Sequence, residues 1–252
     1  MPSSVRVYKD GSVERIPSPN PDPETGVSSK DITISQNPPV SARLYLPNLT
    51  HLHYPNPTLP IFVYFHGRRF ITGSAFSSLY HRYLNILVSL AGVVAVSVEY
   101  RLAPENPLPV AYEDCWTALQ WVASQTIGNK PDKESDPWLL NYGDFGKILI
   151  GGDSSGGNIA HNVAMRAGVE DLKGGVKIFG ALVGYPFFWG SKPIGSESTA
   201  DRGKYWATLV WDLVYPTAPG GIDNPMINPF RVGKPGLAAA LRCWFMLQRR
   251  NH

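Results

Sequence analysis

The order of apolar segments through the middle of the chain constrains the fold most strongly. Residues 61–67, IFVYFHG, form a near-continuous apolar run typical of a strand buried on both faces. After it, such runs alternate with segments whose apolar residues recur every three or four positions, as in an amphipathic helix. In chain order the strands and helices cover residues 61–67, 79–90, 93–98, 110–124, 147–152, 155–168 and 177–186. This alternation predicts an α/β fold with a doubly wound, mostly parallel sheet.

The chain before this alternation predicts shorter elements. Residues 1–30 alternate around an Asp-Gly pair and then become polar and rich in proline, which predicts a hairpin followed by a loop. Two further strands are expected at 31–36 and 42–47. A chain of 252 residues with 43% hydrophobic content is long enough for one sizeable core. We therefore expect a single domain over residues 1–252.

Charge and cysteine content limit the classes of binding partner and the cellular compartment that we expect. The 23 basic and 20 acidic residues give a net charge of +3 and form no basic stripe. We expect a small-molecule ligand, with neither a nucleic-acid nor a membrane partner, and no cofactor or metal. Cys115 and Cys243 make no disulfide framework, and the N-terminus has no apolar secretion signal. We expect a cytoplasmic location, with the nucleus as a second compartment, and leave the oligomeric state open.

The segment Gly152-Asp153-Ser154-Ser155-Gly156 contains the candidate catalytic serine. A serine on a sharp strand-to-helix turn needs small neighbours, and the turn exposes its hydroxyl. The Ser155 N–H, at the start of the helix, can then donate to an oxyanion. A glycine-rich turn ahead of a helix has the same pattern, but here a strand precedes it and helical periodicity follows. The sequence therefore predicts a nucleophile elbow, and phosphate-loop spacings are absent.

Three further motifs support a family resemblance. His66-Gly67-Arg68-Arg69 ends the first buried strand, VEYRLAPENPLP follows at 98–109, and NPMINP occupies 224–229. With the elbow, they make the chain resemble plant carboxylesterases of the hormone-sensitive-lipase-like group. This group belongs to the α/β-hydrolase superfamily and is the one from which gibberellin receptors derive. The resemblance covers residues 5–236.

The resemblance implies a serine esterase for small or acyl esters. Ser154 takes the nucleophile's place, and a cap over the acyl pocket is expected at about residues 187–225. An aromatic core is an equally good interpretation of any single aromatic residue there. The oxyanion hole is assigned to His66, Gly67, Arg68, Arg69 and Ser155, with the backbone N–H groups of Arg68, Arg69 and Ser155 as donors.

The chain departs from the family pattern at Arg68 and Arg69, where relatives usually carry glycines. A glycine-like backbone conformation costs another residue of order 1–2 kcal/mol, and two long cations would project near the acyl site. We expect a misaligned or blocked oxyanion hole. An oxyanion hole retuned by these charges is the alternative.

A second departure concerns the acid and the base, which follow the serine in this fold. Only His161 and His252 come after Ser154. His161 lies about two helical turns, roughly 10 Å, along the elbow helix, out of hydrogen-bond reach. His252 ends a segment, 241–252, that we interpret as an unmatched tail on a chain truncated before the family's acid and histidine. Asp201, Asp212 and Asp223 are the remaining acids considered, and we interpret them as solvated charges.

The expected function is therefore a serine carboxylesterase with impaired catalysis. A non-catalytic small-molecule binder of the gibberellin-receptor type and a folding-defective truncated product are the alternatives. Without the final strands of the family, the strand at 177–186 should be an unpaired edge. We expect such a chain to be marginally stable and to aggregate.

Overall fold

The computed structural model describes residues 5–7, 13–15, 23–51, 58–126, 135–192, 194, 201–230 and 242–246. The predicted N-terminal hairpin is present, since β1 (Val5–Val7) pairs antiparallel with β2 (Val13–Arg15). These two strands form a small sheet of their own. None of the helices in the described ranges is long and apolar enough to cross a membrane.

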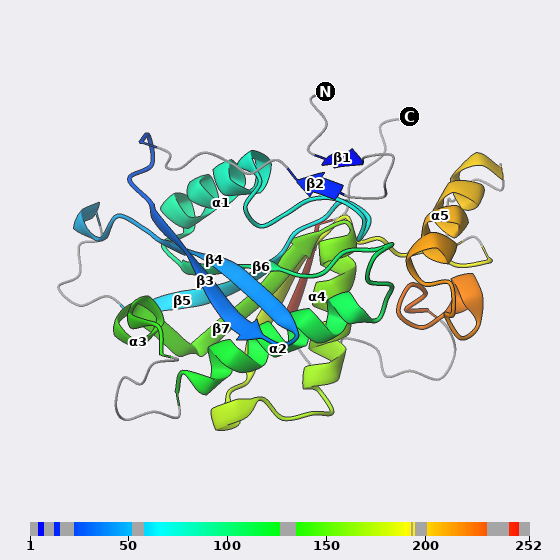
Figure 1. The fold of residues 1–252 in the computed structure, drawn as a ribbon. Helices are drawn as coiled ribbons and strands as arrows, with labels where there is room; N and C mark the ends of the chain where they lie inside the picture. Colours follow the sequence, from blue (N-terminus) through cyan, green and yellow to red (C-terminus); the bar gives the residue numbers. More distant parts are fainter. Residues whose placement is uncertain are drawn as a thin grey trace.

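The main sheet has seven strands in the order β3-β4-β6-β5-β7-β8-β9 (Figure 1). Their bounds are β3 (Ser28–Gln36), β4 (Pro39–Leu46), β5 (Leu59–Phe65), β6 (Val94–Glu99), β7 (Gly143–Asp153), β8 (Ile178–Gly184) and β9 (Arg242–Met246). β4 pairs antiparallel with β3 and β6, and every other neighbouring pair is parallel. The predicted α/β class and mostly parallel sheet are confirmed.

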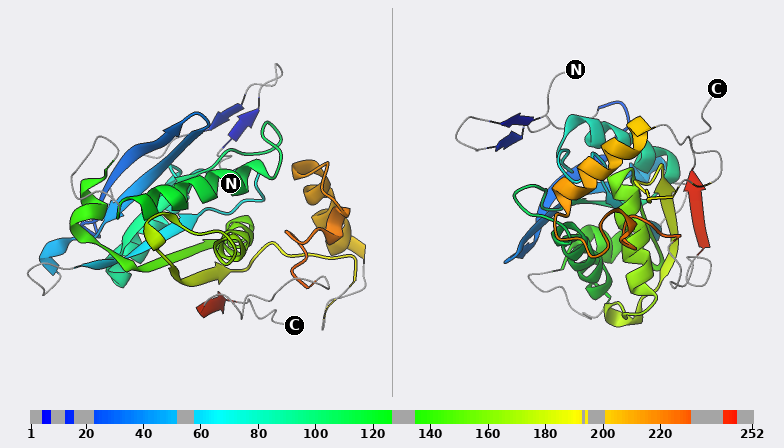
Figure 2. Two further views of the ribbon diagram at one scale, coloured as in Figure 1. Left: turned by 90° about the horizontal axis from the view of Figure 1, so that it is seen from below. Right: turned by 90° about the vertical axis from the view of Figure 1, so that its right-hand side faces the viewer.

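Helices cover both faces of this sheet (Figures 1 and 2). The described helices are α1 (Ser78–Ala91), α2 (Val110–Ser124), α3 (Pro137–Tyr142), α4 (Ser155–Ala167) and α5 (Asp201–Val214), with short 3-10 turns at Leu49–His51, Lys173–Gly175 and Gly221–Asp223. Each face of the sheet has its own apolar core. Buried residues of α2 and α4 belong to the core on one face, and those of α1 belong to the core on the other.

The alternation of side chains along β5 explains why its whole sequence is apolar. Ile61, Val63 and Phe65 point into the core beneath α2 and α4, whereas Phe62 and Tyr64 point into the core beneath α1. All five are at most 4% exposed. A strand covered on both faces has no position left for solvent-facing residues, so the continuous run follows.

The helix predicted over 79–90 forms, but of the apolar residues that defined the pattern only Leu87 packs, partly buried, against the core. Tyr80, Leu84 and Val88 of α1 pack on the sheet. Four apolar residues on the outer face are 40–83% exposed, namely Leu79, Tyr83, Ile86 and Leu90. Apolar residues thus lie all round this helix, and periodicity alone did not separate its two faces.

The expectation of an unpaired edge at residues 177–186 is wrong. β8 pairs in parallel with β9 from Gly180 opposite Arg242 to Gly184 opposite Met246. The stretch interpreted as an unmatched tail therefore supplies a strand, because CWFM has the apolar, aromatic composition that β-pairing favours. Cys115 is fully buried, as expected for a small core residue.

The segment predicted as a cap lies at the carboxyl ends of the parallel strands, where α5 stands beside the sheet (Figure 2). The Leu108 N–H donates to the Val214 carbonyl at 2.8 Å. The Phe70 ring contacts Phe187 edge to face at 6.4 Å between centroids. Trp211 is fully buried and donates through its indole N–H to the Gly221 carbonyl. This segment therefore borders the loops that follow the strands.

Candidate active site at the strand-to-helix turn

Ser154 occupies a sharp turn between β7 and α4, with φ 52° and ψ −115°. Its N–H donates to the Gly184 carbonyl at 2.8 Å, at the end of β8. Its carbonyl accepts from the Asn158 N–H at 3.0 Å and the Phe187 N–H at 2.8 Å. The backbone of a non-glycine residue is thus held in an unfavourable region by contacts on three sides.

The glycines beside Ser154 are required by close contact with β5. A Cβ added at Gly152 or at Gly156 would collide with the Phe65 carbonyl, and at Gly156 also with the His66 carbonyl. Helix α4 can therefore begin directly against the strand that leads into the His66 loop. This contact brings the two sequence motifs, about 90 residues apart, to one place.

The loop after β5 continues the unusual geometry. Arg68, Arg69 and Phe70 have φ of 78°, 62° and 62°. Within the described ranges, the N–H groups of Arg68 and Arg69 donate to no protein acceptor. The Ser155 N–H, in the first turn of α4, likewise precedes the helical hydrogen bonds. These are the three groups that the sequence predicts as oxyanion donors.

His66 and Gly67 hold the loop after β5 in place through ring stacking and hydrogen bonds. The His66 ring is fully buried and stacks on Tyr100 at 4.2 Å between centroids. The Tyr100 hydroxyl donates to the His66 carbonyl at 2.7 Å, and the Gly67 N–H donates to the Tyr80 hydroxyl at 2.8 Å. The Gly67 amide therefore points into the protein.

The two arginine side chains lie at the surface of the loop, and both residues are exposed. The Arg69 guanidinium lies 5.1 Å from the centre of the Trp206 ring on α5. This contact directs one of the two cations toward the predicted cap.

Asp153 has partners that sequence reasoning missed. Its two carboxylate oxygens accept from the hydroxyls of Tyr64 at 2.6 Å and Tyr80 at 3.3 Å. Burial, followed by the nearby Asp153 charge, raises the pKa of both phenols, so both remain protonated donors at neutral pH. A polar hydroxyl inside the otherwise apolar run of β5 was the signal that could have marked Tyr64.

Asn158 is a second residue that the motifs did not reveal. Its side chain accepts from the Tyr112 hydroxyl at 2.7 Å and donates to the carbonyls of Phe187 at 2.9 Å and Met226 at 2.7 Å. One buried amide on α4 thus fastens α2 and both ends of the predicted cap segment.

The side chains considered as catalytic acid or base make contacts with residues other than Ser154, are exposed, or lie outside the described residues. The His161 ring packs edge to face on Phe188 at 5.0 Å between centroids, and His252 lies outside the described residues. Asp223 is half-buried and accepts from the Ser191 N–H at 2.9 Å and from Asn228 at 3.1 Å, so it also holds the loop. Asp212 is exposed on α5, and the side chain of Asp201 lies outside the described residues. Within the described ranges, the Ser154 hydroxyl forms no hydrogen bond with a histidine or carboxylate.

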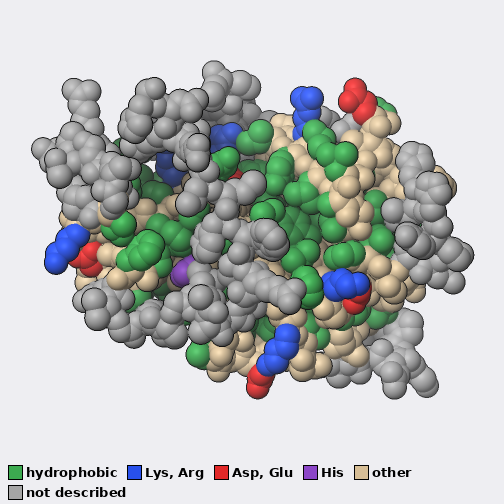
Figure 3. Space-filling model, turned by 180° about the vertical axis from the view of Figure 1, so that it is seen from behind, with side chains coloured by type: hydrophobic (Ala, Val, Ile, Leu, Met, Phe, Trp, Pro, Cys, Tyr) green, Lys and Arg blue, Asp and Glu red, His purple; other side chains and the backbone are tan. Residues whose placement is uncertain are grey.

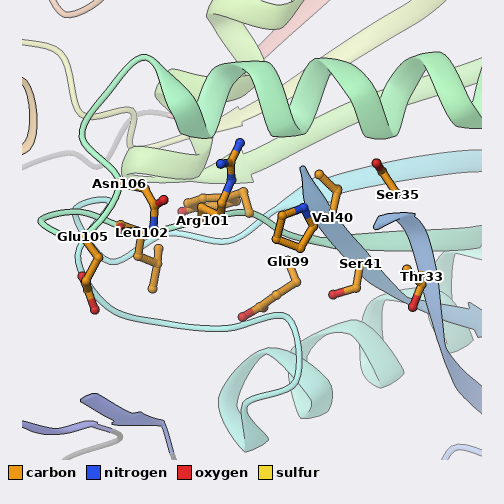
Figure 4. A pocket seen from close by; sticks show the side chains of 11 residues that line it. Thr33, Ser35, Val40, Ser41, Glu99, Arg101, Leu102, Glu105 and Asn106 are labelled. Atoms are coloured by element: carbon orange, nitrogen blue, oxygen red, sulfur yellow. Dashed lines mark hydrogen bonds between the residues drawn. The ribbon is translucent and has the colours of Figure 1, made fainter. Parts of the chain in front are cut away.

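Two hollows lie near the site. A cavity of about 320 Å³ behind the turn is lined by Tyr64, Leu79, Tyr80, Tyr83, Gly152, Asp153, Leu182, Gly184 and Tyr185. Figure 3 shows hydrophobic side chains gathered on the rear of the molecule. A polar cavity of about 370 Å³ between the β3–β4 hairpin and residues 99–106 contains Glu99, whose carboxylate lies 4.0 Å from His66 Nε2 (Figure 4). No group of three His, Cys, Asp or Glu side chains suited to a metal occurs among the described residues.

Residues 62–249 match a family of proteins with the alpha/beta hydrolase fold, and the chain belongs to that family. The match extends to residue 249, within the stretch 241–252 that the sequence analysis interprets as an unmatched tail.

Plant proteins are similar over nearly the whole chain. A 2-hydroxyisoflavanone dehydratase of Glycyrrhiza echinata is 55% identical, over 98% of this chain and 76% of that protein. Hydrolase 3 of Catharanthus roseus is 53% identical, over 94% of this chain and 76% of that protein. An esterase structure from Pyrobaculum calidifontis is 30% identical with a TM-score of 0.61, over 82% of this chain and 62% of that one. The chain thus spans less than two thirds of that esterase, and together these relatives support the plant hormone-sensitive-lipase-like type.

Proposed function

We propose that the chain carries the nucleophile and oxyanion hole of a serine carboxylic-ester hydrolase. The observation that carries this proposal is the position of Ser154, at φ 52° between β7 and α4. It lies beside a loop whose Arg68 and Arg69 N–H groups donate to no acceptor among the described residues. Similarity to a solved esterase at 30% identity supports the same reaction class.

In the proposed reaction, Ser154 Oγ attacks the carbonyl carbon of a small-molecule ester and its proton passes to water. The carbonyl oxygen becomes an oxyanion that accepts from the N–H groups of Arg68, Arg69 and Ser155. Collapse of this intermediate breaks the ester C–O bond, and the alcohol leaves with a proton. Water then hydrolyses the acyl-serine and restores the hydroxyl.

Slow turnover is part of this proposal. Among the described residues no imidazole is hydrogen-bonded to Ser154, and a serine hydroxyl is a weak nucleophile without a base. A serine hydrolase that works without a base keeps the contribution of the oxyanion hole and of binding, with a kcat lower by several orders of magnitude.

Dehydration is a second candidate, favoured by two relatives that are each 55% identical and named 2-hydroxyisoflavanone dehydratase. In such an elimination a base removes the proton next to a carbonyl, the electrons form the C=C bond, and hydroxide leaves as water. The oxyanion formed on the carbonyl would use the same three N–H groups, but no covalent bond to Ser154 is needed.

The first prediction separates these candidates. Wild-type protein, Ser154→Ala and the control Ser89→Ala, an exposed serine on α1, are incubated with p-nitrophenyl acetate, with a fluorophosphonate and with a 2-hydroxyisoflavanone. We expect slow ester hydrolysis and fluorophosphonate labelling of Ser154, both lost in Ser154→Ala and retained in Ser89→Ala.

Equal hydrolysis by wild type and Ser154→Ala would overturn the proposal. Dehydration that survives Ser154→Ala would favour the second candidate. Saturable ligand binding with no labelling and no turnover would favour a binding protein of the gibberellin-receptor type.

A further inference from the structure

We propose that Tyr80 is a positioning residue that locks the oxyanion loop to the nucleophile turn. Its hydroxyl accepts from the Gly67 N–H at 2.8 Å and donates to Asp153 Oδ2 at 3.3 Å. Gly67 directly precedes the donors Arg68 and Arg69, and Asp153 directly precedes Ser154. The inference rests on the proposed role of Ser154.

The arrangement requires a protonated phenol. A hydroxyl can donate one hydrogen bond while it accepts another, whereas a phenolate can only accept. Tyr80 is 4% exposed, and its burial beside Asp153 favours the neutral form. The ring is also 5.5 Å from the His66 ring between centroids, so its place is set by packing as well.

The oxyanion loop needs such a tie because its backbone is strained. Three consecutive residues, Arg68 to Phe70, have positive φ, a conformation that persists only where the surroundings over-determine it. The Gly67 N–H directly precedes this strained run, and it is held by a hydrogen bond to the Tyr80 hydroxyl. Releasing it would let the Arg68 and Arg69 N–H groups move away from the position of the oxyanion.

Close packing between the two segments supports a direct coupling. A Cβ added at Gly67 would collide with the carboxylate and carbonyl of Asp153. Asp153 is held on its other oxygen by the Tyr64 hydroxyl at 2.6 Å. The loop, the turn and α1 are therefore joined at one carboxylate, and Tyr80 is the group that bridges all three.

Three variants that each remove one hydroxyl test the proposal. Tyr80→Phe removes the bridge and keeps the ring. Tyr64→Phe removes the other donor to Asp153 and leaves Gly67 bound. Tyr83→Phe, on the same helix and lining the same cavity, is the matched control. Two quantities are measured in each: the second-order rate of Ser154 phosphonylation by a fluorophosphonate, and hydrogen exchange of the Gly67 amide by NMR.

We expect Tyr80→Phe to slow phosphonylation about tenfold, a part of the roughly 10²–10³-fold lost when an oxyanion donor is removed outright. Exchange of the Gly67 amide should accelerate about tenfold or more in this variant alone. With p-nitrophenyl acetate, kcat should fall while KM stays within about twofold, because the donors act mainly in the transition state.

Other outcomes would overturn the proposal. Unchanged phosphonylation in Tyr80→Phe would exclude a positioning role even if Gly67 exchange rises. An equal loss in Tyr80→Phe and Tyr83→Phe would indicate a general packing effect. If wild-type Ser154 is not phosphonylated, the proposed function fails, and the amide exchange still reports whether Tyr80 holds Gly67.

Discussion

Strain at single residues is concentrated around Ser154. Arg68, Arg69, Phe70 and Ser154 all have positive φ, between 52° and 78°. For a side chain other than glycine each such conformation costs of order 1–2 kcal/mol. The surrounding contacts must offset this cost, so these residues lower the stability of the fold. Their fixed backbone is suited to a preorganised site.

The Arg68→Gly and Arg69→Gly variants should therefore differ in stability. Arg68→Gly relieves strain and should raise the free energy of unfolding by about 1 kcal/mol. Arg69→Gly relieves similar strain but loses the contact with Trp206, worth about 0.5–1 kcal/mol at an exposed site, so its effect should be near zero. Urea unfolding measures both.

The double variant tests the two interpretations of these arginines. With glycines in the loop, kcat for ester hydrolysis should rise more than KM changes, because the donors can align with the oxyanion. Equal or lower kcat would indicate that the cations contribute to a retuned site.

The sequence revealed those parts of the site that are local. Ser154 and its glycines form a contiguous motif, and the His66 loop follows a recognisable strand. Tyr80 and Tyr64 were missed because their partner Asp153 is 73 and 89 residues away. Such pairs depend on how elements pack, and a single sequence carries no periodic signal for them.

At the scale of elements, the crossing of α4 over β5 sets the position of the turn. The first turn of α4 touches the carbonyls of Phe65 and His66, with no space for a side chain at Gly156. A single methyl group there must push the helix away from the strand.

Gly156→Ala should therefore destabilise the fold by about 2–3 kcal/mol, as overpacking of a rigid contact does. Gly184→Ala is the control, because the nearest atom to its Cβ would be the Gly152 carbonyl oxygen at an ordinary 3.4 Å. Thermal unfolding should show a clear loss for the first and little change for the second. Similar melting temperatures for both would contradict the tight crossing.

Prediction of the elements succeeded where burial on both faces gave continuous apolar runs, as in β5, β7 and β8. It failed for β9, because a short apolar stretch gives no indication of its partner strand. The pairing of β8 with β9 is set by the parallel sheet itself, which offers the next free edge.

For the whole molecule, the outer face of α1 is an exposed apolar surface. Leu79, Tyr83, Ile86 and Leu90 recur along one side of the helix, and Leu90 is 83% exposed. Contiguous apolar surface of this kind promotes association. The unpaired edge on which the aggregation expectation rested is absent because β8 is paired, and α1 is the surface through which we expect any self-association.

The variant Ile86→Lys with Leu90→Glu should reduce self-association, measured by light scattering, and change the free energy of unfolding by less than about 0.5 kcal/mol. Leu84→Ala, on the buried face of the same helix, should instead cost about 2–5 kcal/mol. Unchanged association in the charged double variant would assign it to another surface.

The amide of Asn158 has a consequence for how proteins of this shape can diverge. Because it grips the carbonyls of both Phe187 and Met226, the stretch between them leaves and re-enters the domain at almost one point. The hydrogen bonds that Ser154 makes with Gly184 and Asn158 come from outside that stretch, so we expect a change within it to leave them in place. We therefore expect the residues between Phe187 and Met226 to vary in sequence among proteins of this fold, and with them the ligand preference, while the turn at Ser154 is kept.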